Sequence, residues 1–165
     1  MSLLCNPLTR RIHALWSAVV QGLNGLAPLA DLAARLYVAK VFFSSGLVKI
    51  RDWDSTLLLF REEYQVPLLP PELAAVLGTA GELALPILLV AGLFTRFAAS
   101  GLFVLNLMAV VSYYSALKDS PAALRDHLEW GLLLALLMTT QVRMLTADYW
   151  LKRQCDSHCA VAKQA

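Results

Sequence analysis

One acidic residue lies in the middle of a long, mostly apolar stretch. Glu82 has Gly78 and Pro86 one helical turn away on either side. A charge near the centre of a bilayer costs about 2.5–3.5 kcal/mol on insertion scales, so it usually faces other helices and has a partner. Glycine lets a neighbouring backbone approach closely, and proline loosens the local hydrogen-bond ladder. We therefore expect Glu82 to mark a polar site inside a membrane.

The candidate partners of Glu82 are three basic residues of an earlier apolar stretch, Arg35, Lys40 and Lys49. At 100° per residue, Lys40 points about 140° away from Arg35 on a helix. An antiparallel neighbour would bring Glu82 near the depth of Lys40, with Arg35 closer to the cytoplasm. The forked guanidinium of Arg35 suits a bidentate pair with a carboxylate. We predict an Arg35–Glu82 ion pair inside the membrane. Lys40 either joins this pair or extends its side chain toward the membrane interface.

Two interpretations of this pair stay open. It could only fix the register of two helices. Alternatively, it could bind an anionic or quinone-like ligand, or take part in proton handling.

A second polar group is expected near the outer ends of the apolar stretches. His127 and Trp130 share one helical face, so the imidazole could point into the mouth of a bundle. There it could relay protons or coordinate a metal, or only bond a carbonyl or Asp126. Asn106 lies in the middle of another apolar stretch, where an asparagine typically makes a hydrogen bond between two helices. The predicted ligand pocket comprises Lys40, Lys49, Phe42, Gly46, Asn106, Tyr113, His127, Glu129 and Trp130.

The three cysteines are confined to the two ends of the sequence. Cys155, His158 and Cys159 could hold a soft metal, but they lack a fourth ligand, and a disordered tail is the preferred interpretation. The remaining cysteine is Cys5. Because no cysteine falls in a predicted outer link, a membrane enzyme that generates disulfides is disfavoured.

The elements that position these residues follow from hydropathy. The chain is 58% hydrophobic and 16% charged, whereas soluble domains are about half apolar and a quarter charged. Stretches of roughly 18–21 residues are nearly free of charge, which is long enough to cross a bilayer. They are Pro28–Lys49, Leu73–Leu93, Phe97–Tyr114 and Leu128–Met144. These spans predict an all-α integral membrane bundle of four transmembrane helices.

Shorter elements are predicted around the spans. Leu8, Ile12, Leu15, Val19 and Leu23 recur at helical spacing and indicate an interfacial amphipathic helix. In the first link, a short amphipathic helix is expected over Ser55–Tyr64, capped by Asp54 or Ser55. The proline-rich segment Val66–Pro71 either covers an outward-opening cavity or makes a tight reversal on the helix tops. The predicted organisation is an N-terminal cytoplasmic or interfacial segment (1–27), a membrane domain (28–148) and a cytoplasmic tail (149–165).

Basic residues outside the spans favour one orientation. They concentrate at both ends of the chain and at Arg96, whereas the first long link is acidic. The positive-inside rule therefore places both termini in the cytoplasm.

An ordered series of motifs gives the chain a family resemblance. The motifs are Arg35–Val38, Phe42–Lys49 with Asp52-Trp53, Phe60–Pro71, Gly78–Leu83, Gly92–Arg96 and His127–Gly131. Over Leu32 to Asp148 the chain resembles the DoxX family of small four-helix membrane proteins. It departs from the family at Gln141–Asp148, where the family tends to have a glycine-rich turn. The resemblance implies a location in the bacterial inner membrane.

The family implies several functions, since its members have been linked to thiosulfate oxidation with quinone, to oxidative-stress complexes and to operons for metal-binding peptides. We prefer an accessory membrane partner, or a permease-like or ligand-binding component, in metal or oxidative-stress defence. A quinone-linked subunit of a sulfur-oxidising oxidoreductase and a purely structural anchor are the alternatives. The sequence has no complete catalytic set and no flavin, haem or iron–sulfur motif, so catalytic residues and enzyme status stay open, with quinone as a possible cofactor. The expected partners are the lipid bilayer and membrane or surface proteins, but not nucleic acid. Whether the chain also forms a homo-oligomer stays open.

Overall fold

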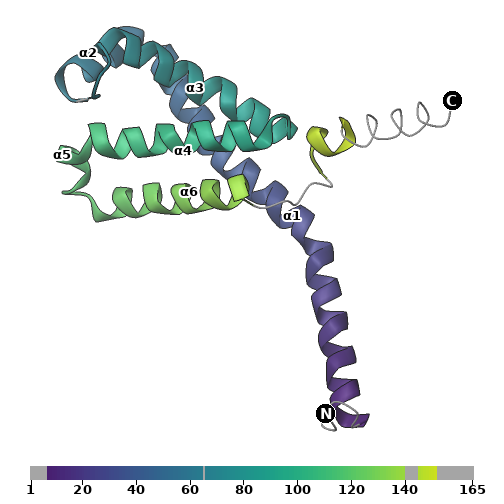
Figure 1. Cartoon of the computed structure of the whole chain (residues 1–165). Coiled ribbons are helices and arrows are strands. Elements are labelled where there is room, and N and C mark those ends of the chain that lie inside the picture. Colours follow the sequence, from purple (N-terminus) through teal and green to yellow (C-terminus); the bar gives the residue numbers. More distant parts are fainter. Residues whose placement is uncertain (1–6, 65, 140–144, 152–165) are drawn as a thin grey trace, which may run out of the picture.

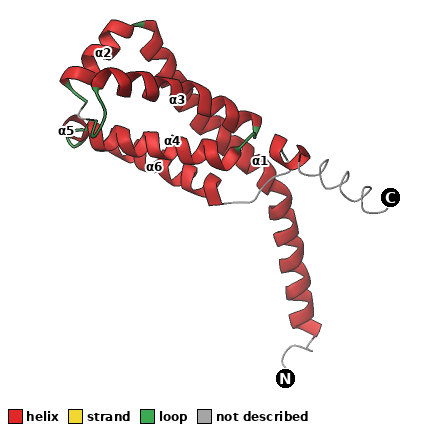
Figure 2. Ribbon diagram, turned by 45° about the horizontal axis from the view of Figure 1, so that its top comes forward, coloured by secondary structure: helices red, strands yellow, loops and turns green. Residues whose placement is uncertain are grey.

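A computed structural model of the chain describes residues 7–64, 66–139 and 145–151. The described residues form helices and connecting turns and contain no strand, which confirms the all-α prediction. The helices are α1 (Pro7–Arg51), α2 (Trp53–Glu62), α3 (Pro71–Ala91), α4 (Thr95–Ser112), α5 (Tyr114–Leu117) and α6 (Pro121–Thr139). Figures 1 and 2 show their arrangement.

The C-terminal half of α1 packs with α3, α4 and α6 into an antiparallel bundle (Figures 1 and 2). Helix α1 lies against α3, α3 against α4, and α4 against α6, which also contacts α1. A short turn joins α3 to α4, and a segment that contains α5 joins α4 to α6, as expected for an up-down-up-down bundle. The turn at Gly92 therefore lies at one end of the bundle, and α2 and α5 lie at the other.

Helix α1 is longer than the sequence predicted. It runs without interruption for 45 residues and includes Pro28, at which the first span was expected to begin. The predicted interfacial helix and the first span are thus one helix, which changes direction part-way along its length (Figure 1). A proline removes one backbone hydrogen bond and bends a helix without necessarily ending it.

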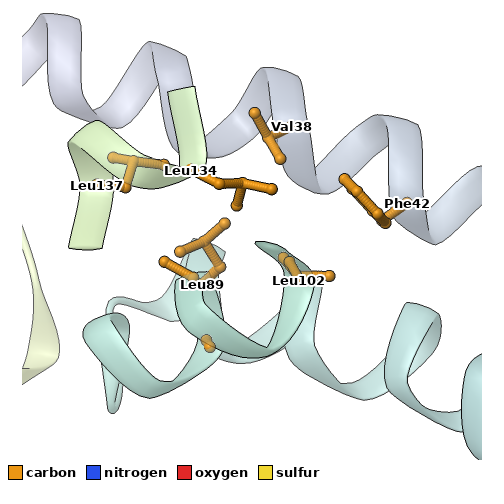
Figure 3. Close-up of a cluster of buried hydrophobic side chains, with 8 residues drawn as sticks. Val38, Phe42, Leu89, Leu102, Leu134 and Leu137 are labelled. Atoms are coloured by element: carbon orange, nitrogen blue, oxygen red, sulfur yellow. The ribbon is translucent and has the colours of Figure 1, made fainter. Parts of the chain in front are cut away.

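Buried aliphatic and aromatic side chains from all four bundle helices form the core (Figure 3). Small residues on α4 let the neighbouring helices approach it closely, as is typical of membrane bundles. The core residues are Val38, Phe42, Leu89, Ala98, Ala99, Leu102, Leu134 and Leu137.

Among the described residues, α3 and α4 are the helices that are long and apolar enough to cross a membrane. Only 28% of the most apolar window of each is buried within the protein. Their apolar surface therefore faces outward, unlike that of a core helix in a soluble protein. Helices α1 and α6 carry more charges, and residues 140–144 of the predicted fourth span lie outside the described residues. The four-span prediction is thus supported for two helices.

The first link folds back on the bundle through α2. Asp52 caps this helix by accepting hydrogen bonds from Ser55 N (3.0 Å) and Ser55 Oγ (2.6 Å). The prediction of Asp54 or Ser55 as the cap was therefore wrong by two or three residues. Phe60 of α2 packs on Ala74 and Ala75 at the start of α3, so the link is fixed against the outer end of the bundle.

The opposite end of the bundle is closed by a contact between the α3–α4 turn and the C-terminal segment. Gly92 ends α3 with φ +67°, and a Cβ there would lie 2.6 Å from Thr146 Cα. Asp148 accepts hydrogen bonds from Phe94 N (2.9 Å), Thr95 N (2.9 Å) and Thr95 Oγ1 (3.0 Å). Its carboxylate thereby caps the start of α4. A negative charge at this position also interacts favourably with the positive end of the helix dipole.

This cap gives a pH-dependent prediction for Asp148. Burial is the largest single influence and would raise its pKa, but the hydrogen bonds from Thr95 and Phe94 together outweigh burial, so the pKa lies below its ordinary value. A lowered folded-state pKa stabilises the fold above the unfolded value of about 3.9, and this stabilisation is lost as the pH falls through the folded value. We expect Asp148→Asn to destabilise the protein by about 1 kcal/mol near neutral pH, because the amide keeps one acceptor oxygen but removes the negative charge at the start of α4. Unfolding of both proteins at neutral and strongly acidic pH should show this difference shrink with acidification; a constant difference would contradict the prediction.

Candidate functional site

Glu82 does have a basic partner in the bundle, and that partner is Lys49. The Nζ atom of Lys49 lies 2.5 Å from Oε2 of Glu82 and also donates to Ser45 Oγ at 2.9 Å. Both charged side chains are only 14% exposed. Gly46 lets α1 and α3 approach here, because a Cβ on it would lie 2.9 Å from the Leu83 side chain. The result is an ion pair between two closely packed helices.

This ion pair lies on the wall of a cavity of about 650 Å³. Each helix from α1 to α6 contributes to the wall, as does the proline-rich segment through Val66 and Leu69. Most of the wall is apolar. Its polar members are Ser44, Ser45, Lys49, Tyr64, Glu82, Ser112, Tyr113, His127 and Trp130.

Aromatic residues connect the outer elements beside the cavity. Tyr64 contacts Phe60 and Tyr113 edge to face, with ring centroids 4.8 and 4.9 Å apart. Tyr113 donates a hydrogen bond to Glu63 at 2.9 Å, which ties the end of α2 to the end of α4. Burial, followed by the nearby Tyr113, Glu82 and Glu63, raises the pKa of Tyr64 to about 12. Tyr64 is therefore a neutral hydroxyl at physiological pH.

The tautomer of His127 follows from its contact with Asn106. Asn106 Nδ2 donates to His127 O at 2.8 Å, so its Oδ1 faces His127 Nδ1, 2.9 Å away. An amide oxygen only accepts hydrogen bonds, so Nδ1 must carry a proton. The neutral ring consequently keeps the lone pair on Nε2, as a proton acceptor.

Trp130 supplies the complementary donor. Its Nε1 atom is buried and has no hydrogen-bond partner within the described structure. The ring contacts His127 (5.0 Å between centroids) and Phe42 (6.3 Å), so its orientation is fixed. Burying this N–H unpaired costs about 1–3 kcal/mol. Less than 1 Å² of the atom is accessible, so an acceptor in the cavity would reach it only after neighbouring side chains shift.

The predicted Arg35–Glu82 pair was wrong. Arg35 is fully buried and pairs with Asp31 at 3.0 Å. It also donates to the backbone oxygens of Leu89, Val90 and Leu145 at 3.3, 3.5 and 2.9 Å. Arg35 therefore caps the end of α3, at the opposite end of the bundle from the cavity.

Helix register explains this correction. Gly46 lies opposite Glu82 and Leu83, so Glu82 is level with the last turns of α1 rather than with Lys40. The prediction placed α3 about six residues out of register, which is about 9 Å along a helix.

The structure brings together only some of the predicted pocket residues. Phe42, Lys49, Tyr113, His127 and Trp130 line the cavity. Gly46 lies just behind it between the two helices, and Asn106 is buried against His127.

Lys40 and Glu129 are exposed and do not line the cavity, so their inclusion in the pocket was wrong. A helical residue near a site in sequence need not face it, because each step turns the side chain by 100°.

Other residues of the site were missed. Ser45 lies one helical turn before Lys49, a spacing visible in the sequence, and Asp31 has the same spacing to Arg35 at the opposite end of the bundle. Tyr64 and Glu63 belong to the first link, and nothing local predicts their contact with Tyr113.

No group of three or more His, Cys, Asp or Glu residues in the described part of the chain could hold a metal ion. The Cys155–Cys159 candidate lies outside the described residues.

The helices and the apolar surfaces of α3 and α4 define a helical membrane protein. A family model described as DoxX matches residues 30–115, which is more than half of the chain. The protein belongs to the DoxX family. No curated protein and no solved structure gives a significant match.

Proposed function

We propose that this DoxX protein binds a small amphipathic molecule in the cavity beside the Lys49–Glu82 ion pair, as an accessory component of metal or oxidative-stress defence. The observation that carries the proposal is this ion pair on the wall of a largely apolar cavity. Charged residues within membrane bundles generally mark ligand or ion pathways. A volume of about 650 Å³ lies within the usual range of small-molecule sites.

The unused hydrogen-bonding groups indicate what the ligand would need. The Lys49 ammonium has three donor hydrogens and makes two contacts, with Glu82 and Ser45. Trp130 Nε1 is a further donor, and Nε2 of His127 is an acceptor. A molecule with an apolar body and a carbonyl or anionic group would therefore match the wall.

The same proposal includes a topology. Four crossings are formed by α3, α4, α6 and the C-terminal half of α1, in the bacterial inner membrane. Arg96, at the Gly92 end of the bundle, and Arg11, before the bundle begins, support a cytoplasmic location for that end. Both termini would then be cytoplasmic, and the cavity would lie toward the outer side.

A quinone-linked subunit is the second candidate, because the unpartnered Trp130 N–H and the Lys49 ammonium are suited to carbonyl oxygens. A bound quinone would supply two-electron, two-proton redox chemistry. Lys49 and Trp130 would hold its oxygens, and His127 could accept a proton. A partner protein would have to provide the sulfur chemistry, since this sequence carries no electron-carrier motif.

The test is to identify what the protein retains from native membranes. Wild-type protein, purified in mild detergent, is analysed by native mass spectrometry beside Trp130→Phe, which keeps an aromatic ring and removes the N–H. We expect a bound small molecule in the wild type and about three- to tenfold weaker retention in the variant. Equal retention would exclude Trp130 as a ligand contact. The proposal fails if the wild type retains nothing and binds no added quinone.

The cellular role needs a separate measurement. Deletion of the gene is expected to lower tolerance to peroxide or to a toxic metal, with recovery on expression of the wild type. Unchanged tolerance to both would contradict a role in either defence.

A further inference from the structure

The N-terminal half of α1 exposes a continuous apolar face. Its large side chains are between 53% and 70% exposed, whereas the bundle half of the same helix buries Val38, Ala39 and Phe42. A Cβ added at Gly22 or Gly25 would meet nothing within 4 Å, so no described element covers this part of the helix. The exposed residues are Ile12, Leu15, Trp16, Val19, Leu23 and Leu26.

These residues occupy one side of the helix only. From Ile12 to Leu26 the apolar positions alternate steps of four and three residues, which keeps them within an arc of about 100°. Ser17, Gln21 and Asn24 lie on the opposite side. A contiguous apolar face on one side of an exposed helix is typical of a surface that contacts another protein or a membrane.

The side chains at the edges of the apolar face belong to basic residues. Exposed Arg11 and His13 lie about 100° to either side of Ile12, at the two edges of the face. The sequence has no acidic residue before Asp31. Basic side chains flanking an apolar face with a tryptophan are typical of helices that lie in an anionic membrane interface.

The direction of the helix agrees with this environment. Arg35 joins α1 to the Gly92 end of the bundle, and the exposed half begins beyond that point. In both views it runs steeply across the direction of α4 and α6 (Figures 1 and 2). If α4 crosses the bilayer, a helix leaving the bundle in this way runs along the membrane surface.

We infer that the N-terminal half of α1 binds the anionic headgroup region of the bilayer at the Gly92 end of the bundle, with its apolar face inserted. The four-three spacing would also fit a coiled coil with a second copy. However, the positions that flank such a seam are His13, Leu15, Val20, Gly22, Ala27 and Leu29, which offer no pairs of opposite charge. Arg11 would instead face a like charge or a neutral residue, so the lipid surface is favoured.

The experiment uses the full-length protein with its cysteines replaced by serine, in nanodiscs of phosphatidylcholine with or without phosphatidylglycerol. Spin labels are placed at Leu23→Cys on the apolar face and, as the matched control, at Gln21→Cys on the polar face. With phosphatidylglycerol, the label at position 23 should be accessible to oxygen, shielded from a water-soluble nickel reagent and about 5–10 Å deep. The label at position 21 should stay accessible to the nickel reagent.

Two results would overturn the inference. Equal access of the nickel reagent to both labels would show that this part of α1 is surrounded by water. Shielding of position 23 from both reagents, with dipolar broadening between labels, would describe a dimer of two copies.

A second variant tests whether the charge of Arg11 contributes to membrane binding. In discs with phosphatidylglycerol, Arg11→Gln should weaken the membrane-bound population about fivefold. In phosphatidylcholine alone, it should change little. The same effect in both lipids would contradict recognition of anionic headgroups.

Discussion

Replacement of Arg35 by methionine is expected to lower the free energy of unfolding by about 3–5 kcal/mol, because breaking a buried pair leaves an uncompensated charge. Arg35 is fully buried and contacts Asp31, which retains only 10% side-chain exposure. Methionine would leave this carboxylate without its partner and the carbonyls of Leu89 and Leu145 without their donor. Unfolding in mixed micelles with increasing sodium dodecyl sulfate, followed by circular dichroism, measures the loss.

Lys40→Met is the matched control for Arg35→Met. It removes a basic residue from the same helix, but Lys40 is exposed, so the expected change is within about 0.5 kcal/mol. Arg35→Lys should fall between the two, since an ammonium keeps the charge but cannot reproduce the forked contacts. If Arg35→Met and Lys40→Met were equally stable, the buried contacts of Arg35 would not stabilise the fold.

The helix boundaries that could be predicted are those set by local sequence. The spans expected at Leu73–Leu93 and Phe97–Tyr114 correspond to α3 and α4 within about two residues at each end. Proline at the start of α3 and glycine at its end act through their own backbone geometry. An uninterrupted apolar run between them is sufficient to indicate a helix.

The partner of Glu82 could not be predicted in the same way. Hydropathy places Glu82 inside a span, but the register between α1 and α3 depends on the link of residues 52–70. That link packs through Phe60 onto Ala74 and Ala75, contacts that no local pattern specifies. Glu82 was predicted to lie level with Lys40 but lies level with Gly46, a shift of about six residues, or about 9 Å along the helix. The sequence therefore predicted that Glu82 would have a basic partner inside the bundle, but not which basic residue that partner would be.

The inner turn shows the same limit. Asp148 caps α4 across a separation of 54 residues from Phe94. Sequence comparison with the family indicated a departure at Gln141–Asp148, without indicating what this carboxylate does. Only the arrangement of the bundle brings the C-terminal segment to the Gly92 turn.

The second large effect is expected at the Lys49–Glu82 pair. Lys49→Met should destabilise the protein by about 2–4 kcal/mol, because the Glu82 carboxylate would remain in a largely apolar cavity without a counter-charge. The combined Lys49→Met and Glu82→Gln substitutions should return stability to within about 1 kcal/mol of the wild type, since neutral replacement of a buried pair is often tolerated. The double-mutant cycle, measured in mixed micelles, should give a coupling free energy of about 2 kcal/mol.

The stability of the double variant makes it the best test between a binding site and a structural anchor. A pair that only fixes helix register would be dispensable once both charges are removed, so ligand retention and stress tolerance would match the wild type. A pair that holds a ligand would leave the double variant folded but empty. We expect the second result: normal stability, about tenfold or greater loss of the retained molecule, and no complementation of the deletion strain. A stable double variant with full complementation would reject the binding site and establish the anchor.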